Sequence, residues 1–269
     1  MSSNHARSLQ GLVVMVTRAR HQAAELVAML QARGARAVLA PAIRITPVTA
    51  AALDRAVREL STKGFRWVLF TSRAGVDAVF ERMRALDLDS SAIAAEVAAV
   101  GKGTAGALQA RGIEPSVIPP TFTTHALASA MPEGSGRVLL ARADIAPEGL
   151  EAVLREKGWT PVRVDAYRTE LASEMSKKAA WALRKGEVDA VTFTSASTVR
   201  GFVGMGGAGA MGEALRSPRI VCIGPVTADH ARAEGLPVDA VAHPHTIEGL
   251  VAALERLFAP GSRHRKETG

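Results

Sequence analysis

The chain has 269 residues, of which 48% are hydrophobic and 22% are charged. These proportions are typical of a folded globular protein and exclude a disordered one. With 33 Lys and Arg against 26 Asp and Glu, the formal net charge is +7, which favours negatively charged ligands. Only 4% of the residues are aromatic, and Tyr167 is the single tyrosine. This argues against a stacking surface for single-stranded nucleic acid.

Three features bear on the compartment in which the protein works. Cys222 is the only cysteine, so no intramolecular disulfide can form. The first apolar stretch, 12–16, is too short for a signal peptide, and no apolar run approaches the roughly 18 residues that span a membrane. We therefore expect a cytoplasmic protein that does not bind a membrane. The basic segment 261–267 is interpreted as a solvated tail.

Short apolar runs alternate with longer helix-patterned segments along the chain. This alternation predicts parallel strands joined by crossover helices, which is an α/β fold. The glycine-rich run 204–209 is expected to be a mobile loop. In chain order the predicted elements are a strand at 12–16, a helix at 22–33, and strands at 37–39, 67–70, 97–100, 138–140, 162–164, 190–193 and 220–223.

The sequence is internally duplicated. Segment 69–72 returns as 192–195 and segment 100–105 returns as 223–228, both 123 residues later, while Arg18 returns 124 residues later as Arg142. A nearly constant offset over separate blocks predicts two copies of one α/β unit. The duplication leaves open whether the copies are tandem domains or have exchanged their first β/α segments.

Small hydroxyl residues follow the predicted strands. In open parallel sheets, ligands bind outside the carboxyl ends of the strands, where free helix N–H groups also favour anions. Helix capping alone is the competing interpretation for each of these hydroxyls. The residues are Thr71 and Ser72 after one strand and Thr194, Ser195 and Ser197 after its repeat.

Segment 101–106 formally matches the dinucleotide-binding pattern G-x-G-x-x-G. No acidic residue lies about 20 positions further on to bind a ribose, and the repeat at 224–229 keeps only G-x-x-T-A. The shared features are therefore a tight turn at Gly101 and Gly224 and a hydroxyl at Thr104 and Thr227. A nucleotide- or flavin-binding protein remains an alternative on this segment alone.

Metal and nucleophile chemistry find little support in the sequence. His243 and His245 form the closest pair of metal ligands, but no Cys, Asp or Glu nearby completes a site. No serine stands in a G-x-S-x-G elbow. Arg18, directly after the first strand, could bind a carboxylate or form a structural ion pair. We expect no metal.

The order, spacing and duplication of these motifs resemble those of the uroporphyrinogen-III synthase family over nearly the whole chain. The resemblance implies two flavodoxin-like domains with parallel sheets, joined by two extended linkers. Residues 1–42 and 170–269 would form one domain and 45–167 the other, with linkers near 41–47 and 166–171. The segments that carry the resemblance are 16–18, 69–72, 100–105, 166–169, 193–197, 223–228 and Thr246.

The resemblance also implies an activity. The linear tetrapyrrole hydroxymethylbilane would lose its terminal hydroxyl as water and close with ring D inverted, giving uroporphyrinogen III without a cofactor. Tyr167 would be the acid that assists hydroxyl departure, in a monomer that takes substrate by transient hand-off from hydroxymethylbilane synthase. A non-catalytic tetrapyrrole-binding module is the alternative. Predicted substrate-binding residues are Arg18, Thr71, Ser72, Gly101, Thr104, Thr194, Ser195, Ser197, Gly224 and Thr227.

Overall fold

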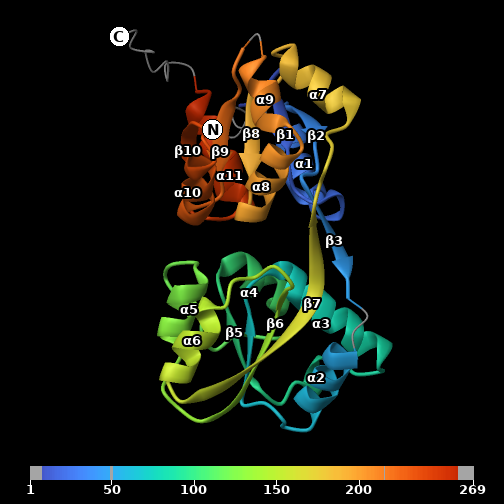
Figure 1. Cartoon of the computed structure of the whole chain (residues 1–269), viewed down its shortest axis with the longest axis vertical. Helices are drawn as coiled ribbons and strands as arrows, with labels where there is room; N and C mark the ends of the chain where they lie inside the picture. The colour runs from blue at the N-terminus through green and yellow to red at the C-terminus, as the bar shows by residue number, and fades with distance from the viewer. Residues whose placement is uncertain (1–7, 49–50, 215, 260–269) are drawn as a thin grey trace, which may run out of the picture. The chain divides into compact units, whose positions relative to one another are not determined.

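A computed structural model describes residues 8–48, 51–214 and 216–259. The predicted basic tail at 261–267 lies outside these residues. The chain divides into two units, each built around its own mainly parallel sheet (Figure 1). The terminal unit takes its described residues from Met1–Arg44 and Glu170–Gly269, and the central unit comprises Ile45–Thr169.

The terminal unit contains a parallel sheet of strand order β10-β9-β8-β1-β2. Its strands are β1 (Val13–Val16), β2 (Arg36–Leu39), β8 (Ala190–Phe193), β9 (Arg219–Cys222) and β10 (Val238–Val241). Helices α1 (Ala24–Ala32) and α11 (Ile247–Leu257) pack on one face. The other face is covered by α7 (Lys177–Arg184), α8 (Ala196–Gly204), α9 (Gly207–Gly212) and α10 (Pro225–Ala233).

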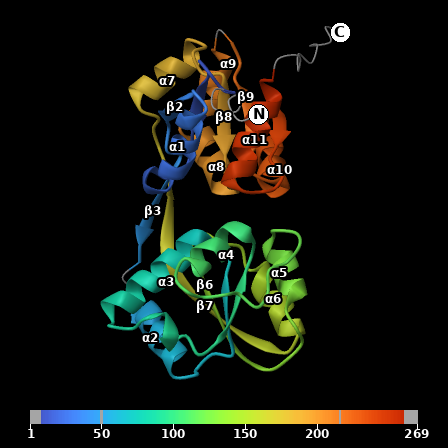
Figure 2. The same ribbon diagram turned by 180° about the vertical axis from the view of Figure 1, so that it is seen from behind.

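The central unit contains a sheet of order β3-β7-β6-β4-β5. Its strands are β3 (Ile43–Pro47), β4 (Trp67–Phe70), β5 (Glu96–Ala99), β6 (Gly136–Ala143) and β7 (Trp159–Leu171). Helices α2 (Ala51–Ser61), α3 (Arg73–Ala85) and α4 (Lys102–Gln109) cover one face. On the other face lie α5 (Thr124–Ala130) and α6 (Gly149–Glu156), which Figure 2 shows side by side.

The two copies of the repeat have exchanged segments. Strands β1 and β2 of the first copy correspond to β6 and β7 of the second, and β4 and β5 correspond to β8 and β9. In the sheets, however, β1 pairs with β8 and β6 pairs with β4. Each sheet therefore combines the first two strands of one copy with the later strands of the other. Numbered within the repeat, the terminal sheet has the order 2-1-3-4-5, a common doubly wound arrangement.

The predicted α/β class and parallel sheets are confirmed, with two differences in the elements. Strands β3 and β10 are additional to those predicted. The glycine-rich run 204–209 is not a loop but the end of α8, a break at Gly206 and the start of α9. Gly206 adopts a φ of 79°, where glycine is favoured, and Ala210 and Met211 then anchor α9 in the core. No helix of the described residues is long and apolar enough to cross a membrane.

Candidate functional site

In the central unit, Tyr167 lies at the carboxyl end of the parallel sheet. It stands beside Ala143, the last residue of β6, and its side chain is 8% exposed. Its hydroxyl is 2.8 Å from the Oγ of Ser72, which follows β4. The fold thus joins two residues that are 95 positions apart in the sequence, because the carboxyl ends of parallel strands meet at one edge.

Ser72 has two roles in this arrangement. Its backbone is extended, with a φ of −162°, and its Oγ accepts a hydrogen bond from the N–H of Gly75 at 3.0 Å, so it caps α3. The same Oγ contacts Tyr167. Burial raises the pKa of Tyr167 above its ordinary value of 10.0, while the Ser72 bond and the charge of Arg142 oppose that rise. The phenol is therefore protonated at neutral pH.

The repeated glycine and threonine occupy equivalent places in both units. Gly101 and Gly224 stand directly before α4 and α10, and Thr104 and Thr227 lie in the first turns of these helices, 6% and 5% exposed. A Cβ on Gly101 would lie 2.8 Å from the ring of Phe122, so a side chain there would require a shift. The hydrogen bonds among the described residues do not use either threonine hydroxyl.

In the terminal unit the predicted residues gather at the ends of β1 and β8, which are neighbours. Thr194 and Ser195 follow β8, and Ser195 forms a reciprocal capping box with Thr198 at the start of α8. Arg18 follows β1 after the buried Thr17, whose hydroxyl donates to the carbonyl oxygen of Thr192 at 2.6 Å. Ser195 is therefore a helix cap as well as a strand-end hydroxyl.

Four charged residues near Tyr167 were not among the predicted site residues. Arg142 is the last residue but one of β6 and is 2% exposed, with the buried Glu151 of α6 against its guanidinium. Arg163 lies near the same Glu151 carboxylate, and Asp144 accepts a hydrogen bond from the N–H of Thr169. Arg142 is the counterpart of Arg18 in the second copy of the repeat. Of the four residues, only Arg142 could have been predicted as a site residue from the sequence, through this match. The partners of Arg142 come from elements whose packing the sequence does not specify.

The histidine pair makes no metal site in the structure. The rings of His243 and His245 meet edge to face at 5.8 Å, and the Nδ1 of His245 lies 2.7 Å from the carbonyl oxygen of Ala242. Within the described ranges, no group of three His, Cys, Asp or Glu side chains is placed to hold a metal ion.

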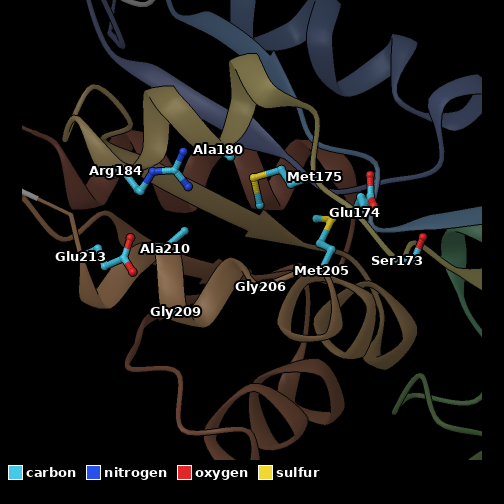
Figure 3. Close-up of a pocket in the computed structure, with 10 residues that line it drawn as sticks. All are labelled: Ser173, Glu174, Met175, Ala180, Arg184, Met205, Gly206, Gly209, Ala210 and Glu213. Carbon is cyan, nitrogen blue, oxygen red and sulfur yellow. The ribbon is translucent and has the colours of Figure 1, made fainter.

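A cavity of about 370 Å³ lies elsewhere in the terminal unit, between α7 and α9 (Figure 3). Methionine, alanine and glycine line much of it, and Arg184 and Glu213 lie at one end. None of the predicted site residues lines this cavity, which is built from helices and their connections rather than from strand ends. The strand ends therefore remain the candidate site.

Comparisons with known proteins bear on the site as a whole. Residues 24–252 match the family model described as uroporphyrinogen-III synthase HemD. The chain is 29% identical over 255 residues to the uroporphyrinogen-III synthase of Synechococcus elongatus, an alignment that covers 92% of this chain and 96% of that protein. It is 32% identical over 253 residues to the porphyrin biosynthesis protein HemD of Ruminiclostridium josui, covering 92% of this chain and about half, 49%, of that protein.

The fold is also similar to a solved structure. A crystal structure of a mutant uroporphyrinogen III synthase from the extremely thermophilic bacterium Thermus thermophilus aligns with a TM-score of 0.67 and 25% identity, covering 91% of this chain and 98% of that one. The resemblance stated from the motifs is thus confirmed by a family model that spans most of the chain. The chain belongs to the uroporphyrinogen-III synthase family.

Proposed function

We propose that this chain is a cyclising hydro-lyase that converts hydroxymethylbilane to uroporphyrinogen III with loss of water and inversion of ring D. The observation that carries the proposal is the family match over residues 24–252, which covers the central unit with Tyr167 and most of the terminal unit. The positive net charge of +7 suits a substrate that carries eight carboxylates.

Tyr167 is the proposed general acid. Its phenol donates a proton to the departing hydroxyl, which leaves as water. Electrons of the pyrrole stabilise the carbon that has lost the hydroxyl, so a cation delocalised over that pyrrole forms. The cation closes onto the substituted carbon of ring D, rearranges through a spiro intermediate and finally loses one proton, which restores the phenol. The net loss is one water. Burial keeps this phenol protonated before the reaction, and the Ser72 hydroxyl can donate to the phenolate that forms.

The strand-end residues of the two units are the proposed substrate-binding groups. Thr104 and Thr227 offer hydroxyls that no described residue uses, and Gly101 and Gly224 precede the starts of α4 and α10, where backbone N–H groups favour an anion. Arg18 supplies a positive charge for a substrate carboxylate. The substrate is electron-rich, so holding its chain in a reactive conformation is the main task of these residues.

The test uses freshly prepared hydroxymethylbilane, with the cyclic products oxidised and their isomers separated by chromatography. We expect type III in excess of the type I isomer that forms spontaneously. Folded protein that yields type I alone would overturn the proposal and leave a tetrapyrrole-binding module. The variant Tyr167→Phe is expected to lower kcat by about 100-fold or more while melting like the parent. Unchanged turnover would remove Tyr167 from the mechanism.

The Thr104→Val and Thr227→Val variants address the binding residues. Each replaces a hydroxyl by a methyl group of similar volume, so the fold is retained while a hydrogen bond to substrate is lost. We expect KM to rise by about three-fold to ten-fold in each, from the loss of about 1 kcal/mol. The same KM in both variants as in the parent would exclude these hydroxyls from binding.

The setting of the reaction is a further part of the proposal. We propose a cytoplasmic monomer that receives its substrate by transient hand-off from hydroxymethylbilane synthase. The support is chemical: the free substrate cyclises spontaneously to the wrong isomer, so a short exposure to solvent favours type III. Light scattering tests the monomer, and a dimer at micromolar concentration would contradict it.

A further inference from the structure

The loop after β6 is held by two arginines. Arg163 of β7 donates from Nη1 to the carbonyl oxygen of Ala146 at 2.8 Å, and from Nη2 to the carbonyl oxygens of Ala143 and Asp144 at 3.1 and 2.9 Å. Arg142 donates from Nη1 to the carbonyl oxygen of Pro147 at 2.8 Å. These bonds fix four carbonyl groups between residues 143 and 147, a segment we name the β6 loop.

A buried carboxylate holds the two arginines in place. Both oxygens of Glu151 lie within hydrogen-bond distance of Nη1 of Arg142, at 2.9 and 3.0 Å, and Oε1 is 3.8 Å from Nη1 of Arg163. The side chains of Arg142 and Glu151 are 2% and 5% exposed. Two guanidinium groups thus share one carboxylate. Arg163 also pairs with Asp165, whose Oδ1 is 3.6 Å from its Nε, and hydrogen bonds fix the geometry of the buried Arg142–Glu151 pair.

Asp144 connects the β6 loop to the backbone on either side of Tyr167. Its N–H donates to the carbonyl oxygen of Tyr167 at 3.2 Å, and its Oδ1 accepts from the N–H of Thr169 at 3.0 Å. Its Oδ2 lies 3.6 Å from Nε of Arg168. Asp144 therefore contacts three consecutive residues that begin at Tyr167.

The first copy of the repeat builds the same kind of sheet without these residues. At the offset of 124, Glu151 corresponds to Val27, Arg163 to Leu39 and Asp144 to Arg20. The position of Tyr167 is Ile43. Of the whole group, only Arg142 has an identical counterpart, Arg18. The fold does not require the group, because the terminal unit forms without it. The group occurs together with the tyrosine.

We propose that Asp144 and the arginines that hold its loop are positioning residues for Tyr167. They fix the β7 backbone at Tyr167 so that its phenol stays against Ser72 and aimed at the departing hydroxyl. This inference rests on the proposed role of Tyr167. The position of the phenol strongly affects the rate, because displacing a catalytic group by about 1 Å can lower the rate by about 100-fold.

Two substitutions of Asp144 separate hydrogen bonding from charge. Asp144→Asn removes the charge but keeps an oxygen that can accept from Thr169, whereas Asp144→Ala removes both. We expect Asp144→Ala to lower kcat by about 10-fold to 100-fold with little change in KM, and Asp144→Asn to keep most of the parental kcat. Equal losses in both variants would overturn the inference, because the charge alone would then matter. Parental kcat in folded Asp144→Ala would overturn it too.

A second variant acts on the loop from its other side. Arg163→Lys keeps the positive charge near Glu151, but its single ammonium nitrogen cannot occupy the two separate positions from which Nη1 and Nη2 donate to the three carbonyl groups. We expect it to lower kcat as Asp144→Ala does, so the inference stays testable if that variant does not fold. The matched control is Asp77→Ala, which breaks an aspartate–arginine contact of 2.7 Å on α3 that involves no residue of β7. It is expected to turn over like the parent.

The position of the phenol can be followed without turnover, because Tyr167 is the only tyrosine. With tyrosine labelled by carbon-13 at the ring ζ position, the parent and Asp144→Asn should give one sharp resonance. Asp144→Ala and Arg163→Lys should broaden or split it, and an unchanged single resonance in both would overturn the inference. A failure of the proposed function shows differently: Tyr167→Phe would then turn over like the parent while the resonance still responded to Asp144→Ala.

Discussion

Tyr167 is a position at which the two copies of the repeat differ in chemistry. The first copy has the apolar Ile43 there, whereas Tyr167 carries a hydroxyl that reaches Ser72. A buried phenol that packs in the core and bonds to a helix cap has few ways to move. Its environment therefore controls both its proton affinity and its direction.

A first prediction for a single residue concerns stability at high pH. Because burial raises the pKa of Tyr167 in the native state, the unfolded chain releases its phenol proton at a lower pH than the native chain does. The contribution of Tyr167 to stability is therefore complete below about pH 10 and is lost as the pH rises through the native pKa. Urea denaturation between about pH 8 and pH 11 should show a steeper decline above about pH 10 for the parent than for Tyr167→Phe. Parallel declines would contradict the raised pKa.

A second prediction concerns Cys222, which is fully buried in the core of the terminal unit. Burial raises the pKa of its thiol to about 12. Since the thiolate is the reactive form, an aromatic disulfide reagent at about pH 8 should leave the native protein unmodified. In urea the same reagent should modify one thiol per chain, because Cys222 is the only cysteine. Rapid modification of the native protein would contradict this burial.

At the scale of elements, helix α8 depends on the close approach of a backbone. A Cβ on Gly201 would clash with the carbonyl oxygen of Ala42, and that oxygen accepts a hydrogen bond from the N–H of Ala172. The helix thus packs directly against the point where the chain leaves the terminal unit and the point where it returns. A rigid backbone contact of this kind leaves no room for a methyl group.

We therefore expect Gly201→Ala to lower the free energy of unfolding by about 1–3 kcal/mol, as overpacking does. Gly204→Ala is the matched control on the same helix, because its Cβ would meet nothing within 4 Å. Since alanine favours helix more than glycine does, this control should be neutral or slightly stabilising. Urea denaturation monitored by circular dichroism measures both. Equal effects of the two substitutions would contradict the close contact.

At the scale of the whole molecule, the exchange of segments makes the two units unequal in sequence. The central unit is one continuous stretch, Ile45–Thr169. The terminal unit needs residues from both ends of the chain, because β1 and β2 complete the sheet next to β8. Without them the core would lose Val14, Val16, Leu26 and Leu30, which pack with α11.

This inequality predicts how fragments of the chain behave. Fragment 45–169 should fold alone, with a cooperative urea transition. Fragment 170–269 should show no cooperative urea transition by itself and should gain one only when fragment 1–44 is added. The reason is that the core lacks the buried apolar side chains of residues 1–44, and the loss of such a side chain costs about 2–5 kcal/mol. Circular dichroism and analytical ultracentrifugation of the separate and mixed fragments measure this. Cooperative folding of 170–269 by itself would contradict the requirement for β1 and β2.

Much of the fold was predictable from local pattern. Strands β4 and β8 were predicted with the bounds that the structure has, because their apolar runs are buried from end to end and begin and end sharply. Strand β10 was missed because its residues are only partly buried, so its apolar pattern is weak. The glycines at 204–209 suggested a loop because the tertiary packing that holds α9 is not visible locally.

The candidate site was predictable in part for the same reason. Strand-end hydroxyls and the repeated G-x-x-T-A pattern are local features, whereas the contact of Ser72 with Tyr167 joins distant segments. The match of Arg142 to Arg18 in the repeat is visible in the sequence. Glu151, Asp144 and Arg163, in contrast, acquire their roles only through contacts across the sheet and its loops. The binding roles of the predicted residues stay predictions until the variants are measured.

By itself, the sequence determined the α/β class, the duplication, the family and the singular position of Tyr167. These follow from periodicity and self-similarity, which are properties of residues near one another or at fixed offsets. Only the tertiary structure decided that β1 pairs with β8 and β6 with β4, so that the copies exchange their first strands. Either pairing buries the same apolar faces, and the choice therefore depends on connections and packing that no local pattern encodes.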